Sequence, residues 1–154
     1  MMTGAPAPAA HTDAELTSLL SLLTSMRPPV RSVAVGHARD GASRAAAQAF
    51  IRAWEALDRD VLTVVDWPEE AASWLRPAQR LTAQAPDAWV LAGAPSGVAH
   101  LARRLRRSCG WDPERTFGFA SLAALHMVEF VGADALDGLR GASADGGAWE
   151  IRRG

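Results

Sequence analysis

The chain has 154 residues, of which 49% are hydrophobic and 21% are charged. This length suits one compact domain with a real core, and the composition excludes a globally disordered chain. The formal net charge of −1 provides no strong field that would recruit nucleic acid or an anionic membrane, so we expect neither as a partner.

The basic residues are all Arg, since the sequence contains no Lys, and Ala is abundant. This usage is typical of a GC-rich genome of the actinobacterial type. Tyr is absent, whereas Trp occurs six times. The single cysteine, Cys109, precedes Gly110 and is interpreted as a small residue at a helix end, because no sequence motif supplies the base that a nucleophile needs.

The N-terminal residues 1–11 are rich in Pro and Ala, and we expect a disordered tail followed by a single domain over 12–154. The next stretch is rich in Leu at helical spacing and predicts an amphipathic helix to about Met26. Thr12 or Asp13 caps it, and Glu15 is in the right place for a capping-box partner to Thr12. No basic residue precedes this stretch, so it does not read as a signal peptide, and we expect a cytoplasmic protein or a piece of a larger one.

The rest of the chain alternates between strand and helix patterns. The strands are continuous apolar runs, which are typical of a parallel sheet covered by helices on both faces. The sequence therefore predicts a three-layer, doubly wound α/β fold with a mostly parallel sheet. In chain order we expect strand 32–35, helix 43–57, strand 61–67, helix 69–83, strand 87–93, helix 97–107, strand 115–120, helix 122–131, and weak strands 137–143 and 147–153.

Ligands of such sheets bind beyond the carboxyl ends of the parallel strands. Here those ends are 37–43, 66–68, 93–97 and 120–121. Backbone amides at the helix N-termini of this edge suit a small polar ligand. The ligand-binding residues that we expect there are His37, Arg39, Asp40, Ser43, Trp67, Ala94, Ser96 and Ser121.

Three of these residues have alternative interpretations. His37 is either a satisfied turn histidine or a ligand contact. Trp67 either packs in the core or offers a stacking wall at the mouth of a cleft. Ser96 is expected to cap the helix that begins at Gly97 and also to contact the ligand.

Motifs for cofactors and catalysis are missing from the sequence. Gly36 and Gly41 lack the spacing of a dinucleotide-binding loop, and there is no Walker lysine. Ser96 stands one residue too far from Gly93 for a nucleophile elbow. The four histidines show no pair at metal-ligand spacing, so we expect neither a metal nor a cofactor. The basic run 103–107 complements a helix dipole and is interpreted as a solvated face.

Three segments carry a family resemblance: "PDAWVLAG" at 86–93, a helix ending in "LRRSCGW", and "VGADALDGLRGAS". In this order and spacing, from about Asp13 to Ser143, the chain resembles the second lobe of type 1 periplasmic binding proteins of the leucine/isoleucine/valine-binding branch. The resemblance implies a single Rossmann-like lobe and a non-enzymatic role in small-molecule binding or sensing.

The sequence departs from that family where ligands are contacted. The family's first turn usually carries Asp and then Tyr-Gly, whereas here His37 and Gly41 occupy those places. The family's loop after the third strand often carries an aromatic residue that contacts the ligand, whereas this chain has Ala94-Pro95 there. The family's turn after the fourth strand often carries an acid that binds the ligand's ammonium group, whereas this chain has Ala120. The departures therefore weaken the inherited specificity for amino acids.

A lone lobe would leave bare the face that meets the other lobe in the family. We therefore expect a partner, either in a homodimer or as a separate complementary lobe. Two other functions stay open: an interaction module that dimerises through a degenerate pocket, and a small α/β enzyme that uses His37 and Asp40 as an acid–base pair.

Overall fold

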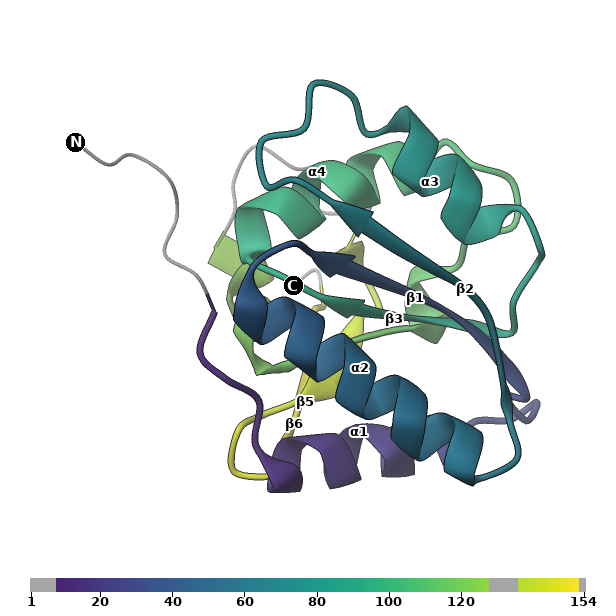
Figure 1. Ribbon diagram of the computed structural model, residues 1–154. Helices are drawn as coiled ribbons and strands as arrows, with labels where there is room; N and C mark the ends of the chain where they lie inside the picture. The colour runs from purple at the N-terminus through teal and green to yellow at the C-terminus, as the bar shows by residue number, and fades with distance from the viewer. Residues whose placement is uncertain (1–7, 128–135, 153–154) are drawn as a thin grey trace.

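The computed structural model describes residues 8–127 and 136–152. Within them, one sheet has the strand order β2-β1-β3-β4-β5-β6 (Figure 1). Neighbouring strands from β2 to β5 are parallel, and β6 pairs antiparallel with β5. The strands are β1 (Ser32–Ala38), β2 (Asp60–Trp67), β3 (Ala88–Ala92), β4 (Thr116–Gly118), β5 (Arg140–Ala142) and β6 (Ala148–Glu150).

Helices cover both faces of the sheet, which confirms the doubly wound α/β fold. On one face lie α1 and α2, and on the other lie α3, α4 and the 3-10 helix η2 (Figure 1). No helix in the described ranges is long and apolar enough to cross a membrane. The helices are α1 (Asp13–Thr24), α2 (Gly41–Ala56), α3 (Leu75–Thr82), α4 (Pro95–Leu105), and the 3-10 helices η1 (Pro113–Arg115) and η2 (Ala120–Met127).

The core has one hydrophobic cluster on each face of the sheet. Phe50 and Trp54 of α2 stack in the first cluster, with ring centroids 5.5 Å apart. Trp67 lies in the second cluster together with apolar residues of α4. β1 is central and buried on both faces, whereas β2 is an edge strand in which Val64 keeps 41% of its surface exposed.

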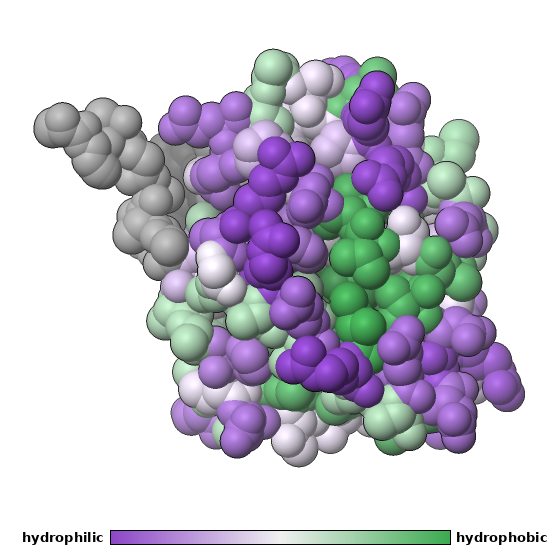
Figure 2. Space-filling view, in the orientation of Figure 1, coloured by the Kyte–Doolittle hydropathy of each residue, from purple (hydrophilic) through white to green (hydrophobic). Residues whose placement is uncertain are grey.

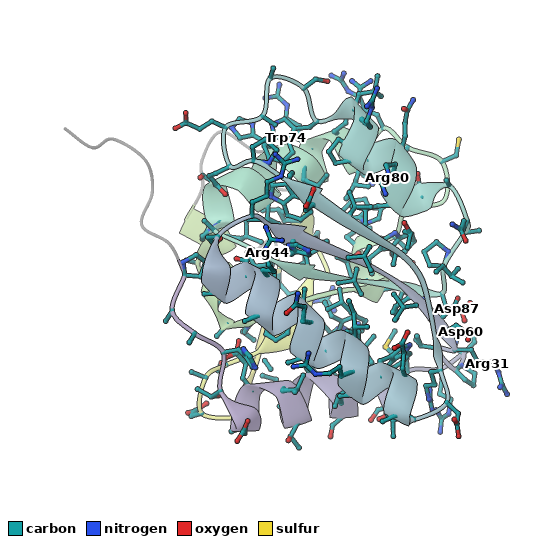
Figure 3. All side chains as sticks on the ribbon, in the orientation of Figure 1. Arg31, Arg44, Asp60, Trp74, Arg80 and Asp87 are labelled. Carbon is teal, nitrogen blue, oxygen red and sulfur yellow. The ribbon has the colours of Figure 1, made fainter. Side chains whose placement is uncertain are left out.

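The start of α1 forms the capping box that the sequence predicts. The Thr12 hydroxyl accepts a hydrogen bond from the Glu15 N–H at 3.0 Å, and Glu15 Oε1 accepts one from the Thr12 N–H at 3.1 Å. At the opposite edge of the sheet, Asp87 Oδ2 accepts from the Arg31 and Ser32 N–H groups. Figure 3 shows Arg31 and Asp87 together at that amino edge, far from Arg44 at the start of α2.

Three expected helices differ most from the observed ones. The helix expected over 69–83 begins only at Leu75, which places Pro77 in the first turn where its missing N–H costs no helical bond, and Glu69 instead binds Ser96 of α4. The helix expected from Gly97 begins at Pro95 with Ala94 as its N-cap, so Ser96 is not the cap residue. The helix expected over 122–131 is the end of η2, and 128–131 fall outside the described residues, as do 1–7 of the expected tail and residue 153.

Candidate ligand-binding site

A cavity of about 230 Å³ opens at the carboxyl edge of the sheet. The segment that leads into α1 runs along this edge, where the arrows of the parallel strands end (Figure 1). Residues 8–11 of that segment form one wall of the cavity, and the start of α2 forms another. The lining is completed by the strand ends: Glu15, Ala42, Ser43, Ala46, Ala92, Gly93, Phe119, Ala120, Ser121 and Ala144.

Glu15 brings a carboxylate into this wall although only 3% of its surface is exposed. Its Oε2 accepts a hydrogen bond from the Ala120 N–H at 2.6 Å, in addition to the capping-box bond from Thr12. Sequence reasoning assigned Glu15 only to the capping box. A helix that precedes a parallel strand and packs on it begins near that strand's carboxyl end, and this rule would have placed Glu15 at the site.

Asp40 and Ser43 form the N-cap of α2. Asp40 Oδ1 accepts from the Ser43 N–H and Oδ2 accepts from the Ser43 hydroxyl, both at 2.8 Å. Asp40 therefore binds its own helix rather than His37. His37 is 6% exposed, and its Nδ1 donates to the Ala38 carbonyl at 2.8 Å. Among the described residues no hydrogen bond joins His37 to Asp40, so the geometry does not favour the acid–base pair.

Glu69 occupies the N-terminus of α4 in a similar way. The Ser96 hydroxyl donates to Glu69 Oε2 at 2.9 Å. A Cβ on Gly97 would lie 2.7 Å from both carboxylate oxygens, so Gly97 allows Glu69 to approach the helix closely. Ser96 thus lies at the expected edge of the sheet, but its hydroxyl already donates its proton to Glu69 and not to a ligand.

An acidic side chain of the chain itself lies at the N-terminus of three of the helices that begin at this edge. Asp40 caps α2, Glu69 lies against α4, and Glu15 accepts from the first N–H of η2. The positive end of a helix dipole favours an anion, and here that anion is internal. Two of the backbone amides that we expected to hold an anionic group, those of Ser43 and Ala120, are therefore already bound to carboxylates.

The two hydroxyls in the cavity wall offer oxygen lone pairs. The Ser43 hydroxyl donates its proton to Asp40, and the Ser121 hydroxyl donates its proton to the Gly93 carbonyl at 2.7 Å. A hydroxyl has one donor and two acceptor positions, so each oxygen can still accept. Together with the Glu15 carboxylate, the described wall thus presents acceptors to a ligand.

The remaining expected site residues lie outside this wall. Arg39 forms an exposed ion pair with Asp66 at 3.4 Å, which contributes no more than about 1 kcal/mol. Ala94 is 4% exposed and has no functional group. Trp67 is fully buried, packed against Gly36, so the expectation that its ring forms an accessible stacking wall is wrong. The described residues contain no cluster of His, Cys, Asp or Glu that could hold a metal ion.

Comparisons with known proteins bear on the fold. No protein-family model matches the sequence, and no curated protein matches it. Solved structures do match, beginning with a putative branched-chain amino acid ABC transporter protein from Rhodospirillum rubrum, with a TM-score of 0.67 and 23% identity. The match covers 84% of this chain and 36% of that one.

Two further solved structures agree with it. A substrate-binding periplasmic protein from Ralstonia solanacearum gives a TM-score of 0.72 at 20% identity, covering 89% of this chain and 38% of that one. The branched-chain amino acid binding protein LivJ from Streptococcus pneumoniae, solved with isoleucine, gives 0.64 at 10% identity, covering 85% and 36%. The chain therefore spans little more than a third of these proteins and has the fold of a single type 1 periplasmic-binding lobe.

Proposed function

We propose that the chain is a non-enzymatic binding module whose cavity takes a small amine with a compact apolar body. The proposal depends on one observation: the described wall combines a buried carboxylate, that of Glu15, with two hydroxyls whose protons are already donated within the chain. A ligand that donates hydrogen bonds and carries positive charge complements this wall.

The proposed ligand differs from a free amino acid in lacking a carboxylate. Asp40, Glu69 and Glu15 lie at the N-termini of α2, α4 and η2, positions that would otherwise favour an anion. A ligand carboxylate would meet like charges there, and repulsion between like charges disfavours binding. The alanines and Phe119 of the wall suit a short aliphatic body in about 230 Å³.

Three compounds of matched shape test this proposal: 2-methylbutylamine, isoleucine and 3-methylpentanoic acid. The first is isoleucine without its carboxylate, and the third is isoleucine without its amine. Binding is followed by the backbone amide NMR signals of Gly93, Ala120 and Ser121. We expect the amine to shift these signals in a saturable way and the acid to leave them unchanged, with isoleucine weaker than the amine.

A matched pair of variants assigns the amine to the cavity. Glu15→Gln removes the buried charge and keeps the side-chain shape, and it should weaken amine binding at least about tenfold, the loss expected for a charge-assisted hydrogen bond. Asp13→Asn removes an exposed carboxylate on the same helix and should leave the affinity unchanged. Equal effects of the two variants, or tighter binding of the acid than of the amine, would refute the proposal.

A second candidate function is a dimerisation module, and the exposed edge strand favours it. Figure 2 shows apolar side chains gathered over β2, between α2 and α3. Val64 of β2 and Leu75 at the start of α3 are among the large apolar residues with the greatest exposure in the described chain, at 41% and 39%. A second copy that added its own β2 would extend the sheet and cover Val64, as exposed edge strands commonly require.

A further inference from the structure

A second hollow, of about 380 Å³, lies beside α4 on the opposite face from α1 and α2. It shares no lining residue with the cavity at the carboxyl edge. The loop before α3 forms one side and the outer surface of α4 forms the other. Its lining residues are Ala72, Ser73, Trp74, Leu75, His100, Arg103, Arg104 and Arg107, which we call the arginine groove.

The arginines of this groove come from the end of α4 and the turn after it. Arg103 and Arg104 follow His100 by three and four residues, which places all three side chains on one face of α4, and Arg107 lines the same groove from the turn beyond Leu105. In the described part of the chain, no carboxylate lies within ion-pair distance of these three guanidinium groups, and none of them donates a hydrogen bond. Three guanidinium groups, each planar and with several N–H donors, therefore line one groove.

The charge around the groove is strongly one-sided. Between residues 71 and 111 the sequence has six Arg and one acidic residue, Asp87, although the whole chain carries a net charge of −1. Asp87 lies at the amino edge of the sheet, where it binds Arg31 and Ser32. A neighbouring hollow of about 360 Å³ adds Arg76 and Arg80 and shares Ala72 and Ser73 with the groove, and the one carboxylate in its lining, Asp66, is paired with Arg39. An anion near this face meets positive potential from several directions.

A flat aromatic pair lies within the groove. The rings of Trp74 and His100 are 5.9 Å apart and inclined by only 7°, so they stack. Trp74 in turn meets the buried ring of Trp67 edge to face, at 6.2 Å and 64°. Trp74 is thus anchored to the core, and Figure 3 shows it beside the start of α3. The helix dipole accounts for the arginines in the last turn of α4. It does not account for a stacked aromatic pair in the same groove.

We propose that the arginine groove binds a nucleoside polyphosphate. The phosphates accept hydrogen bonds from Arg103, Arg104 and Arg107, since guanidinium groups bind phosphate oxygens in a bidentate way. The flat base lies against the His100–Trp74 pair, where stacking adds to the affinity. This site is independent of the amine-binding cavity, because the two share no residue.

The test uses isothermal titration calorimetry of the whole chain with ATP, inorganic tripolyphosphate and adenosine. ATP should bind saturably and more tightly than either part alone. Replacing the three arginines together (Arg103→Gln, Arg104→Gln and Arg107→Gln) should weaken ATP binding at least about tenfold, the loss expected when charge-assisted hydrogen bonds to phosphate are removed. His100→Ala should weaken ATP binding and leave tripolyphosphate binding unchanged.

A matched triple variant supplies the control. Arg31→Gln, Arg44→Gln and Arg52→Gln remove the same charge from exposed positions away from the groove, two of which are labelled in Figure 3. Circular dichroism verifies that both triples are folded. The proposal is overturned if ATP does not saturate the wild-type chain, or if both triples weaken ATP binding equally. It is also overturned if tripolyphosphate binds as tightly as ATP. Binding of single-stranded DNA by a chain that does not bind ATP would overturn it as well.

Discussion

The carboxylate of Glu15 on α1 accepts a 2.6 Å hydrogen bond from the backbone N–H of Ala120, which lies 105 residues further along the chain. Because the same side chain completes the capping box with Thr12, it joins the first helix to the turn after β4. One buried carboxylate therefore supports both the fold and the wall of the cavity.

Replacing this carboxylate should cost stability. Glu15→Ala should lower the free energy of unfolding by about 2 kcal/mol, because the N–H groups of Thr12 and Ala120 lose their acceptor in a place with little water. Glu15→Gln keeps one acceptor oxygen and should cost about half as much. Urea unfolding measures both, with Asp13→Ala as the exposed control. A Glu15→Ala variant no less stable than Asp13→Ala would contradict the bond.

Two glycines should respond in opposite ways to an added methyl group. A Cβ on Gly36 would lie 2.7 Å from the ring of Trp67, so Gly36→Ala should destabilise the fold by about 1–3 kcal/mol through overpacking. Gly41, at the start of α2, has nothing within 4 Å of such a Cβ. Gly41→Ala should therefore be neutral or stabilise by about 0.5 kcal/mol, because Ala loses less backbone entropy on folding. Thermal unfolding distinguishes the two, and equal melting temperatures would refute the packing of Trp67 on β1.

Two buried tryptophans should differ in what their indole N–H contributes. Trp89 Nε1 donates to the Leu81 carbonyl at 2.8 Å, whereas Trp67 Nε1 has no partner among the described residues. Both rings are at most 2% exposed, so the loss of volume is similar in Trp89→Phe and Trp67→Phe. Trp89→Phe should cost about 1 kcal/mol more, which is the net value of a buried hydrogen bond. Chemical denaturation compares them, and a greater loss in Trp67→Phe would reveal a partner for that indole.

The edge strand gives a prediction about association. If β2 pairs with a second copy, Val64→Lys should convert a dimer into a monomer, because a charge on an exposed edge strand disfavours pairing. Light scattering after size-exclusion chromatography measures the mass. Leu57→Lys, at an exposed position just after α2, serves as the control and should leave the dimer intact. A wild-type monomer at high concentration would exclude this mode of dimerisation.

The overall architecture could be predicted from the sequence because it depends on local patterns. The apolar run of β3 and the capping box of α1 are short-range signals, and both are confirmed. The position of Trp67 could not be settled in the same way. Its place at the end of β2 suggested a cleft wall, but it shares a face with buried Val65 and packs under α3 and α4. Alternation within the strand was the stronger signal.

The prediction of a helix that begins at Glu69 was wrong for a different reason. The composition of the loop 68–74 suits a helix, but Pro77 is tolerated only in the first turn of a helix, and α3 indeed begins at Leu75. The competing contact is the bond of Glu69 to Ser96, which depends on α4 lying beside the loop. The acidic character of the carboxyl edge was missed for the same reason, since it arises from Glu15 and Glu69, whose partners there lie far away in sequence.

Residues 8–11 form a wall of the cavity without belonging to the sheet or to its helices. The shape of the binding space is thus decided partly by an appendage that precedes the first helix. Substitutions in that appendage, or a peptide fused to it, can retune affinity while the domain remains intact. For the same reason, a terminal tag is not a neutral addition when ligands of this protein are sought.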